Sequence, residues 1–413
     1  MKNIFKFLTL RDRIGEPPYE YDFLYNLPES EYPKYLKKIY KYRTGENLNL
    51  KHPKTFNEKI QWIKLYGVTQ LMRDCTDKVK VRDYVQERIG EEYLKPVLQI
   101  IPNNTSVIAR NDSILGDEAI QRNLRKGETR VNEGIAYDSD SEVCDLPERQ
   151  QIQRQEEVKQ ETMNENSGIK HKFQNVDCHG TQNVVVPLND RTHDNKNNDI
   201  TTYFDQIDFD KLPDSFVIKT NHGCKWQYII KNKNEFLQNK RLFELVKRNM
   251  TGWLEQEFWL FEGFEMQYKG IEPKILIEPL MREEVNTPSK EIQVYCFNDT
   301  PKIAVKIHNK NEITVYDENL KITNDPFGFE EEKIDVEADD LTNRTFVLSK
   351  QLCKDKDFKL VRVDWLIYRN KAYFEEMTFT PYSGFNANIT DKNNIQTGKL
   401  IYLERLCYEF GVY

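Results

Sequence analysis

Residues 216–223 read Phe-Val-Ile-Lys-Thr-Asn-His-Gly, an apolar segment that ends in Lys219 and continues into a short loop containing Gly223. The apolar, β-branched residues predict a strand, and the loop after it brings backbone N–H groups near the lysine. An ammonium and backbone N–H groups together suit a phosphate. A lysine at a strand end is more often simply solvated. This stretch alone therefore predicts a strand, and a phosphate-binding site here is only a hypothesis.

The spacing of apolar residues divides the rest of the chain into helices and strands. Upstream, Thr55-Phe-Asn-Glu58 is a capping box that opens a helix ending at Gly67, and a second helix is predicted from near Asp77 to Gly90. Downstream, a helix rich in Leu and Phe is predicted at about 235–258. Further strands are predicted at 228–230, 274–278, 293–297, 303–307, 359–364 and 372–376. The predicted fold class is therefore α/β (α+β) with mixed sheets.

A second candidate group lies on two of the predicted strands near the end of the chain. Strand alternation places Arg362 and Asp364 on one face of 359–364, and Phe374 and Glu376 on one face of the next strand. Two carboxylates on adjacent strands, with an arginine beside one, can hold a Mg2+ that bridges ATP phosphates. A purely structural ion pair between Arg362 and Asp364 explains the pattern equally well.

The segment 101–201 differs in composition from everything around it. Residues 101–200 contain two aromatics, Tyr137 and Phe173, and carry 12 Lys and Arg against 18 Asp and Glu. Such a segment buries too little apolar surface to offset the entropy of ordering. We therefore predict a disordered insertion, with a partner-binding segment as the alternative. His171, Cys178 and His179 match no standard zinc spacing.

Composition also excludes several classes of function. The net charge of −7 is concentrated in the insertion, and the rest of the chain is nearly neutral, which argues against nucleic-acid binding. No run of eighteen apolar residues exists, so no membrane span is expected. The first ten residues do not form a signal peptide, and the seven cysteines are odd in number and irregularly spaced. We expect a cytoplasmic protein with reduced thiols.

Five motifs, taken in order, resemble the signatures of one family. They are Pro53-Lys-Thr-Phe-Asn-Glu-Lys-Ile-Gln-Trp62, Thr76-Asp-Lys-Val-Lys-Val-Arg82, Leu212-Pro-Asp-Ser-Phe-Val-Ile-Lys-Thr-Asn-His-Gly223, Arg362-Val-Asp364 and Glu376-Met-Thr-Phe-Thr-Pro381. The set is similar to that of the TupA-like ATP-grasp proteins, which are associated with bacterial teichuronopeptide and capsular polysaccharide synthesis. The resemblance covers roughly 30–100 and 203–400.

The resemblance implies roles that the residues do not show by themselves. Without it, Lys78 and Glu278 would be interpreted as ordinary charged surface residues. Lys78 and Lys219 look like the two lysines that contact ATP phosphates, and His222 and Gly223 like part of the loop over them. Glu278 looks like the hinge position near adenine and ribose. The implied Mg2+ ligands are Asp364 and Glu376, with Arg362 stabilising a developing acyl phosphate.

The implied activity is that of an ATP-dependent, ADP-forming carboxylate–amine ligase. The expected substrates are a carboxylate, for example a uronic acid, and an amine, either an amino acid or an amino sugar. The expected parts are an N-terminal region (1–100), the insertion (101–201), a small nucleotide-binding subdomain (202–281) and a C-terminal subdomain with the metal site (282–413).

The sequence departs from the family pattern at three places, and two alternative functions follow from the residues. Gln293 stands where the family commonly has a lysine, Glu375 replaces the usual glycine, and an arginine expected near His308-Asn309 is absent. These changes leave open a degenerate member that only binds nucleotide. A glycosyltransferase of the same pathway also stays open, because such enzymes often carry an Asp-x-Asp metal motif. That pattern occurs at Asp208-Phe-Asp210 and Asp355-Lys-Asp357, although a solvated turn explains each of them.

Overall fold

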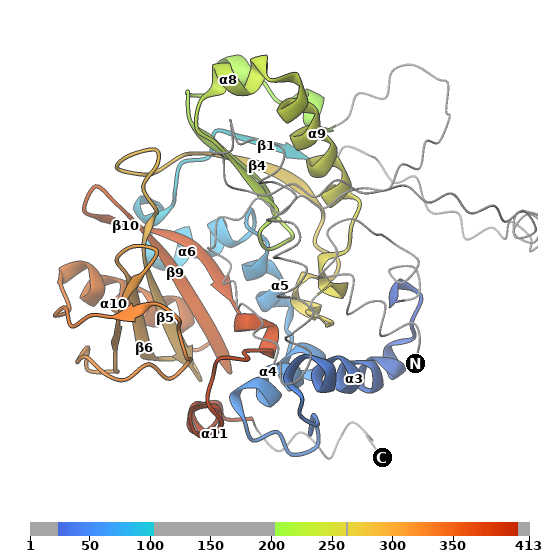
Figure 1. Cartoon of the computed structure of the whole chain (residues 1–413), viewed down its shortest axis with the longest axis vertical. Helices are drawn as coiled ribbons and strands as arrows, with labels where there is room; N and C mark the ends of the chain where they lie inside the picture. The colour runs from blue at the N-terminus through green and yellow to red at the C-terminus, as the bar shows by residue number, and fades with distance from the viewer. Residues whose placement is uncertain (1–23, 103–202, 262, 404–413) are drawn as a thin grey trace, which may run out of the picture. The chain divides into compact units, whose positions relative to one another are not determined.

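The structure, a computed structural model, describes residues 24–102, 203–261 and 263–403. All of them belong to one compact unit (Figure 1). The predicted insertion lies outside the described residues except at Ile101 and Pro102, so its predicted disorder stays a prediction.

In the described residues before the first strand, the α-helices include α3 (Tyr32–Thr44), α4 (Phe56–Tyr66), α5 (Gln70–Thr76) and α6 (Val81–Ile89). The predicted capping box is present, with the Thr55 hydroxyl accepting from the Glu58 N–H and α4 ending before Gly67. The second predicted helix begins at Val81, later than expected, because Asp77 Oδ1 accepts from the N–H groups of Val79 and Lys80 and holds them in a turn.

A small antiparallel sheet has the strand order β1-β4-β2-β3. Its strands are β1 (Gln99–Pro102), β2 (Phe216–Thr220), β3 (Gln227–Ile230) and β4 (Lys274–Pro279). Two helices, α8 (Lys233–Gln238) and α9 (Lys240–Leu254), lie over it (Figure 1). The prediction of one helix over 235–258 was wrong, because Asn239 ends α8 and its side chain caps α9 by accepting from the Leu242 N–H.

A six-stranded sheet has the order β10-β9-β5-β6-β7-β8 and is antiparallel except for its last pair. Its strands are β5 (Lys290–Phe297), β6 (Thr300–Ile307), β7 (Glu312–Tyr316), β8 (Glu332–Lys333), β9 (Leu360–Tyr368) and β10 (Lys371–Thr378). Helix α10 (Asp340–Cys353) packs on β5 and β6, and α11 (Asp391–Leu400) packs on α4. Short 3-10 helices are η1 (Glu29–Glu31), η2 (Glu91–Tyr93), η3 (Tyr203–Gln206), η4 (Phe209–Lys211), η5 (Phe258–Leu260), η6 (Met266–Tyr268) and η7 (Pro381–Gly384).

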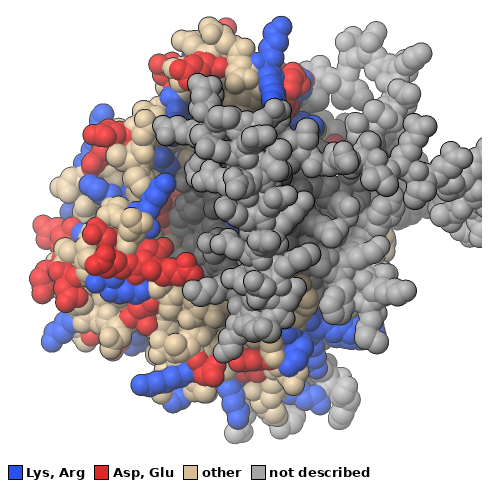
Figure 2. Space-filling view, viewed as in Figure 1, with Lys and Arg blue, Asp and Glu red and all other residues tan. Residues whose placement is uncertain are grey.

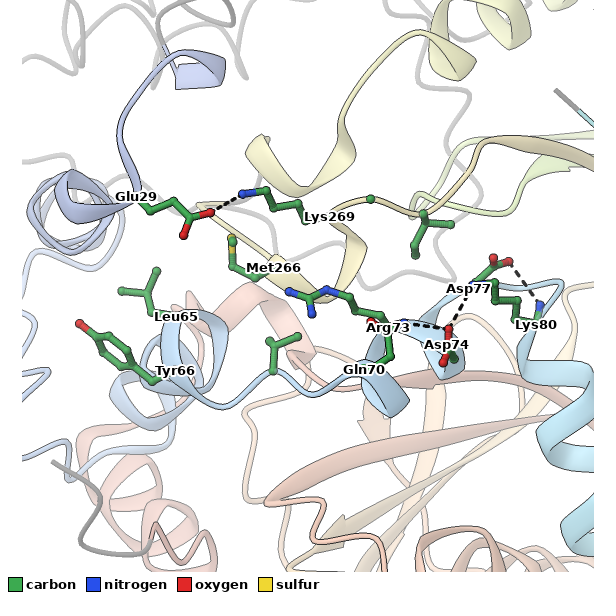
Figure 3. A pocket seen from close by; sticks show the side chains of 13 residues that line it. Glu29, Leu65, Tyr66, Gln70, Arg73, Asp74, Asp77, Lys80, Met266 and Lys269 are labelled. Atoms are coloured by element: carbon green, nitrogen blue, oxygen red, sulfur yellow. Dashed lines mark hydrogen bonds and ion pairs between the residues drawn. The ribbon is translucent and has the colours of Figure 1, made fainter. Parts of the chain in front are cut away.

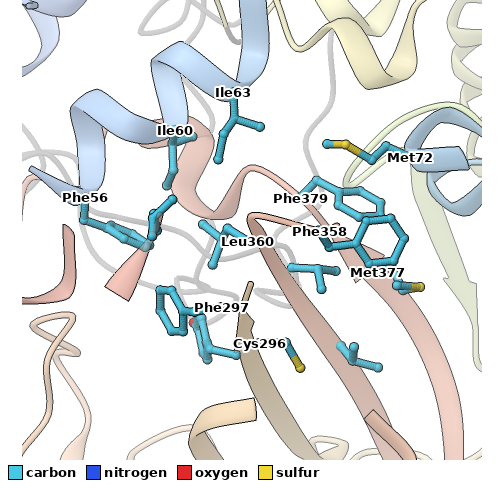
Figure 4. Packing of buried hydrophobic residues seen from close by; sticks show 14 of the residues in the cluster. Phe56, Ile60, Ile63, Met72, Cys296, Phe297, Phe358, Leu360, Met377 and Phe379 are labelled. Atoms are coloured by element: carbon cyan, nitrogen blue, oxygen red, sulfur yellow. The ribbon is translucent and has the colours of Figure 1, made fainter. Parts of the chain in front are cut away.

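One hydrophobic core joins the N-terminal helices to this large sheet. Phe56, Ile60 and Ile63 of α4 belong to the same buried cluster as Leu360 of β9 and Met377 of β10 (Figure 4). Burial of aliphatic and aromatic side chains of this size contributes about 1.5–3 kcal/mol each. The packing therefore fixes α4, and the segment after it, relative to the strands that carry Asp364 and Glu376.

The described residues carry both kinds of charge at the surface. Basic and acidic side chains are intermingled on the face shown in Figure 2. Among the described residues, no helix combines the length and apolarity needed to cross a membrane.

Candidate active site

Lys219 and Glu278 meet across the two central strands of the small sheet. Lys219 lies at the end of β2, and its Nζ is 2.8 Å from Glu278 Oε2 on β4. Both side chains are buried. Burial lowers the pKa of Lys219, but the carboxylates of Glu278 and Glu375 outweigh it and raise that pKa above its usual value. Burial conversely raises the pKa of Glu278, while Lys219 and Lys95 lower it below its usual value. Both groups are therefore charged.

Two residues that the sequence did not name as site residues complete the cluster. Lys95 precedes β1, and its Nζ lies 2.6 Å from Glu278 Oε2 and 2.5 Å from Glu375 Oε2. Glu375 Oε1 is in turn 3.4 Å from Lys219 Nζ. Two lysines and two glutamates thus neutralise one another in a largely buried cluster. Lys95 shows no sequence pattern, and Glu375 was visible only as a departure from the family.

A β-bulge explains how Glu375 and Glu376 both reach the site. The register of β10 against β9 shifts between Phe374, which pairs with Trp365, and Glu376, which pairs with Asp364. Glu375 is the extra residue in the bulge. The prediction that Phe374 and Glu376 share a face was therefore wrong, because strict alternation fails at a bulge. Phe374 instead packs edge-on against Trp365 in the core.

The predicted arginine and carboxylates lie together on the large sheet. Arg362 donates from Nε and Nη2 to the two oxygens of Asp364, each at 2.8 Å, and both side chains are 1% exposed. Nη2 lies 3.9 Å from Glu376 Oε1, which accepts from the Thr378 hydroxyl at 3.1 Å. Arg362 and Asp364 share one strand face as predicted, and the structural ion pair that the sequence left as the alternative to a metal site is present.

Gln293 lies in the same cross-strand row as the two carboxylates. It pairs with Asp364 across β5 and β9, and Asp364 pairs with Glu376 across β9 and β10. Gln293 is fully buried, and its Nε2 has no hydrogen-bond partner among the described residues. A buried amide N–H without a partner is costly, so the row is suited to receive an acceptor from a ligand.

Lys78 connects the N-terminal region to the loop after β2. Its Nζ donates to the Gly223 carbonyl at 2.7 Å and lies 3.8 Å from Glu376 Oε2. Its backbone N–H donates to the Asn221 carbonyl at 3.2 Å, and the Asn221 side-chain amide donates to Asp77 at 2.9 Å. Residues 145 positions apart in sequence are therefore joined, and Lys78 lies between the loop and the metal-site candidate.

His222 and Gly223 shape the loop through packing. The His222 ring is buried against Trp226, and Nε2 lies 3.1 Å from the Trp253 carbonyl, to which it donates. Burial lowers the pKa of His222 to about 4, so the ring is neutral. A Cβ on Gly223 would lie 2.4 Å from the Trp226 ring, so this close approach requires glycine.

The site residues named from sequence fall into two linked groups. Lys219 and Glu278 belong to the lysine–glutamate cluster, and Glu376 contacts both Lys78 and Arg362. No group of three or more His, Cys, Asp or Glu side chains suited to a metal ion occurs within the described ranges. Mg2+ commonly takes one or two protein oxygens and completes its shell with water and substrate phosphates. The assignment of Asp364 and Glu376 as its ligands stays a prediction, and both oxygens of Asp364 accept from Arg362.

Comparison with known sequences decides the family. A profile described as TupA-like ATPgrasp matches residues 166–402, more than half of the chain. The chain belongs to the TupA-like ATP-grasp family. The resemblance drawn from the motifs is confirmed, and so is the ATP-grasp fold. The matched region begins after the motifs at 53–62 and 76–82, and the roles of Lys78 and of the other site residues stay predictions. No curated protein matches this family member in sequence.

Several solved ATP-grasp structures also resemble the chain. D-alanine–D-alanine ligase from Bacillus anthracis shares 18% identity over 50% of this chain and 57% of its own, with a TM-score of 0.29. The D-cycloserine synthetase DcsG shares 13% over 45% and 54%, with a TM-score of 0.25. The ATP-grasp ligase PsnB, complexed with a minimal precursor, shares 11% over 45% and 46%, with a TM-score of 0.23. The match spans about half the length of these proteins, and likenesses this weak transfer neither activity nor substrate.

Proposed function

We propose that this TupA-like protein is an ATP-dependent, ADP-forming ligase that joins a carboxylate to an amine. The observation that carries the proposal is the arrangement around Glu376. Within 4 Å of its carboxylate lie the ammonium of Lys78 and the guanidinium of Arg362, and Asp364 pairs with it across the strands. Cations beside paired carboxylates suit a Mg2+-bound polyphosphate.

Each group has a part in binding or orienting the reactants. Lys78 and Lys219 are proposed to bind ATP phosphates, and the loop with His222 and Gly223 to cover them. Glu278 is proposed to lie near adenine and ribose. Asp364 and Glu376 would hold Mg2+, which when bound neutralises phosphate charge. Catalysis then rests on positioning and electrostatic stabilisation.

The proposed reaction has two balanced steps. A carboxylate oxygen attacks the γ-phosphorus and the bond to the β–γ bridging oxygen breaks, so that ADP leaves and an acyl phosphate forms. The amine nitrogen then attacks the acyl carbon, the C–O bond to phosphate breaks, and the amine loses a proton as the amide forms. Arg362 lies beside both carboxylates, where its fixed positive charge would stabilise the acyl phosphate.

The family resemblance supports a role in decorating a bacterial cell-surface polysaccharide from the cytoplasm. A uronic acid would then supply the carboxylate, and an amino acid or an amino sugar the amine.

A nucleotide-binding protein without turnover is the second candidate, because Glu375 and Glu278 both engage Lys219. The glycosyltransferase alternative gains no support from its two motifs. Asp208 is an exposed partner of Lys211, and Asp357 is an exposed partner of Lys359.

Hydroxylamine tests the proposal. This small amine intercepts acyl phosphates, so incubation with Mg-ATP, glucuronate or galacturonate, and hydroxylamine should yield a hydroxamate and one ADP per product. AMP and pyrophosphate would indicate adenylate chemistry and overturn the roles of Arg362 and the carboxylate pair. Nucleotide binding without any ADP release, across a panel of uronic acids, would favour the second candidate.

A further inference from the structure

Helix α3 carries a concentration of positive charge in a chain whose net charge is −7. Its 13 residues include five basic side chains and no acidic one. Four of the five are spaced i, i+3, i+4 and i+7, so they share one side of the helix, and all four are exposed. Both signs of charge occur across the view in Figure 2, but basic side chains predominate over α3. These four residues, called here the lysine face of α3, are Lys34, Lys37, Lys38 and Lys41.

The opposite side of α3 holds the lysine face toward solvent. Tyr32, Leu36, Ile39 and Tyr40 are buried and belong to the hydrophobic core that α3 shares with α4 and the large sheet. Because a packed helix presents the lysines, a partner can bind them without the entropy loss of ordering a loop.

Carboxylates near the start of α3 neutralise little of this face. Glu29 pairs with Lys269 at 2.5 Å, on the far side of the segment that leads into the helix (Figure 3). Glu31 pairs with Lys34 at 2.6 Å. The acidic side chains next to the helix thus engage one lysine of the face.

The other three lysines keep their charge available. Lys37, Lys38 and Lys41 form no ion pair within the ranges that the structure describes. Lys41 donates to the Gly45 carbonyl at 2.6 Å, and a carbonyl leaves the positive charge in place. Three like charges on one exposed side of a helix attract an anionic surface, even though the whole chain is acidic.

Two tyrosines border the lysine face. Tyr35 and Tyr42 are seven positions apart and half-buried. The Lys38 ammonium lies 4.9 Å from the centre of the Tyr35 ring, and the Lys34 ammonium 5.9 Å from it. Tyrosine combines an apolar ring with a polar hydroxyl, which suits the boundary between lipid and water.

The sequence before α3 favours a lipid partner over a soluble acidic polymer. Residues 1–23 lie outside the described residues, but residues 2–13 contain four basic residues and one acidic residue, Asp12. A mixture of basic and large apolar residues is typical of segments that bind lipid surfaces, whereas a soluble polyanion gains little from the apolar ones. The apolar residues between the charges are Ile4, Phe5, Phe7, Leu8 and Leu10.

We infer that the lysine face of α3 binds the surface of a bilayer rich in anionic lipids. The phosphates of the headgroups pair with Lys37, Lys38 and Lys41, and the bordering tyrosines contact the headgroup layer. The protein would lie on the bilayer without crossing it. This inference goes beyond the proposed ligase function and does not depend on it.

Co-sedimentation with lipid vesicles tests the inference. The full chain is mixed with vesicles of phosphatidylglycerol or of phosphatidylcholine, and bound protein is measured against lipid concentration. Lys37→Gln, Lys38→Gln and Lys41→Gln are combined in one variant. A second variant combines Lys37→Arg, Lys38→Arg and Lys41→Arg, which keeps the charge. The Tm of each variant shows that it is folded.

We expect binding to phosphatidylglycerol vesicles and none to phosphatidylcholine vesicles. The glutamine variant should bind about 100-fold more weakly, because each lysine near an anionic surface strengthens binding by about fivefold. The arginine variant should bind like wild type. Raising NaCl from about 0.1 M to about 1 M should release the protein, because the screening length shortens from about 10 Å to about 3 Å.

A matched control removes three positive charges from another helix. Lys240→Gln, Arg241→Gln and Arg248→Gln change exposed positions on α9 and should leave vesicle binding unchanged. Equal losses in this control and in the glutamine variant of α3 would mean that net charge alone attracts the protein, and the lysine face would lose its assignment.

Three further results would overturn the inference. One is equal binding to both lipids or to neither, and another is unchanged binding by the glutamine variant of α3. The third is complete loss of binding when residues 2–13 alone are deleted, which would assign the interaction to that segment. Calorimetric titration with polygalacturonate covers the rival partner: binding to it, without binding to vesicles, would assign the face to an acidic polysaccharide. None of these measurements uses ADP formation, so the ligase proposal stands or fails separately.

Discussion

Lys95 and Glu375 form an ion pair of 2.5 Å, although 280 positions separate them in the chain. Glu375 also lies 3.4 Å from Lys219, a residue proposed to bind phosphate, and Glu278 lies 2.8 Å from the same ammonium. Lys219 is therefore neutralised by carboxylates before any nucleotide arrives. These two carboxylates compete with a phosphate for the ammonium of Lys219.

Replacing Glu375 by glutamine should strengthen nucleotide binding. The substitution removes a negative charge that competes with phosphate for Lys219, so we expect the Kd for Mg-ATP to fall by about three- to tenfold. Isothermal titration at fixed ionic strength measures this change. Glu283→Gln, which removes an exposed carboxylate paired with Lys290, is the matched control. Weaker binding by Glu375→Gln would instead mean that this carboxylate contacts the nucleotide.

Replacing Lys95 by methionine should destabilise the fold. The change leaves Glu278, a buried carboxylate, with one cation in place of two. Removing one partner from a buried ion pair typically lowers the free energy of unfolding by roughly 3 kcal/mol. Urea denaturation would measure the loss, and adding Glu375→Gln to Lys95→Met should restore part of it. Equal stability of wild type and Lys95→Met would show that solvent already screens the cluster.

The two carboxylates of the metal-site candidate should respond differently to amide substitution. Glu376→Gln should abolish ADP formation with little change in Tm, because Glu376 lies on the partly exposed side of the pair. Asp364→Asn removes the charge that two buried hydrogen bonds from Arg362 neutralise, so it should lower both turnover and Tm. ADP release and thermal denaturation separate the two effects. Full turnover by folded Glu376→Gln would end its assignment as a Mg2+ ligand.

Deletion of the insertion should leave the rest of the chain folded. The two described ends of this segment meet, because Gln99 exchanges two hydrogen bonds with the backbone of Asp208, at 2.7 and 3.0 Å. Ile101 and Phe204 also share one buried cluster. A short Gly/Ser linker in place of 103–200 should keep Tm within a few degrees and preserve nucleotide binding. Loss of cooperative unfolding would show that the segment packs against the domains.

Acid should destabilise the protein partly through His222. Its pKa is about 4 in the folded protein, below the ordinary value of 6.5, because burial disfavours the charged ring. The unfolded chain therefore takes up this proton first, and the neutral ring's contribution to stability falls as pH drops from about 6.5 to 4. The loss is on the order of 3 kcal/mol. His222→Gln should show a shallower stability decrease over that window than wild type, measured by denaturation at each pH.

Local patterns predicted the parts of the site that lie on regular strands. The sequence predicted the strand that carries Lys219, and it predicted that Arg362 and Asp364 lie on one face of another strand. Both predictions need only neighbouring residues, because side chains in a strand alternate with a period of two. Lys95 could not be found this way, since its partners come from strands far away in sequence. The bulge at Glu375 was also missed, because an extra residue in a strand leaves no mark in composition.

That bulge has a consequence for how substitutions combine. In a regular strand, consecutive side chains serve opposite faces, yet here Glu375 contacts Lys219 and Glu376 contacts Lys78. One short piece of backbone thus sets the electrostatic surroundings of two ammonium groups that come from separate parts of the chain. The effects of changing 375 and 376 on nucleotide affinity should consequently be non-additive, with each residue's contribution conditional on its neighbour.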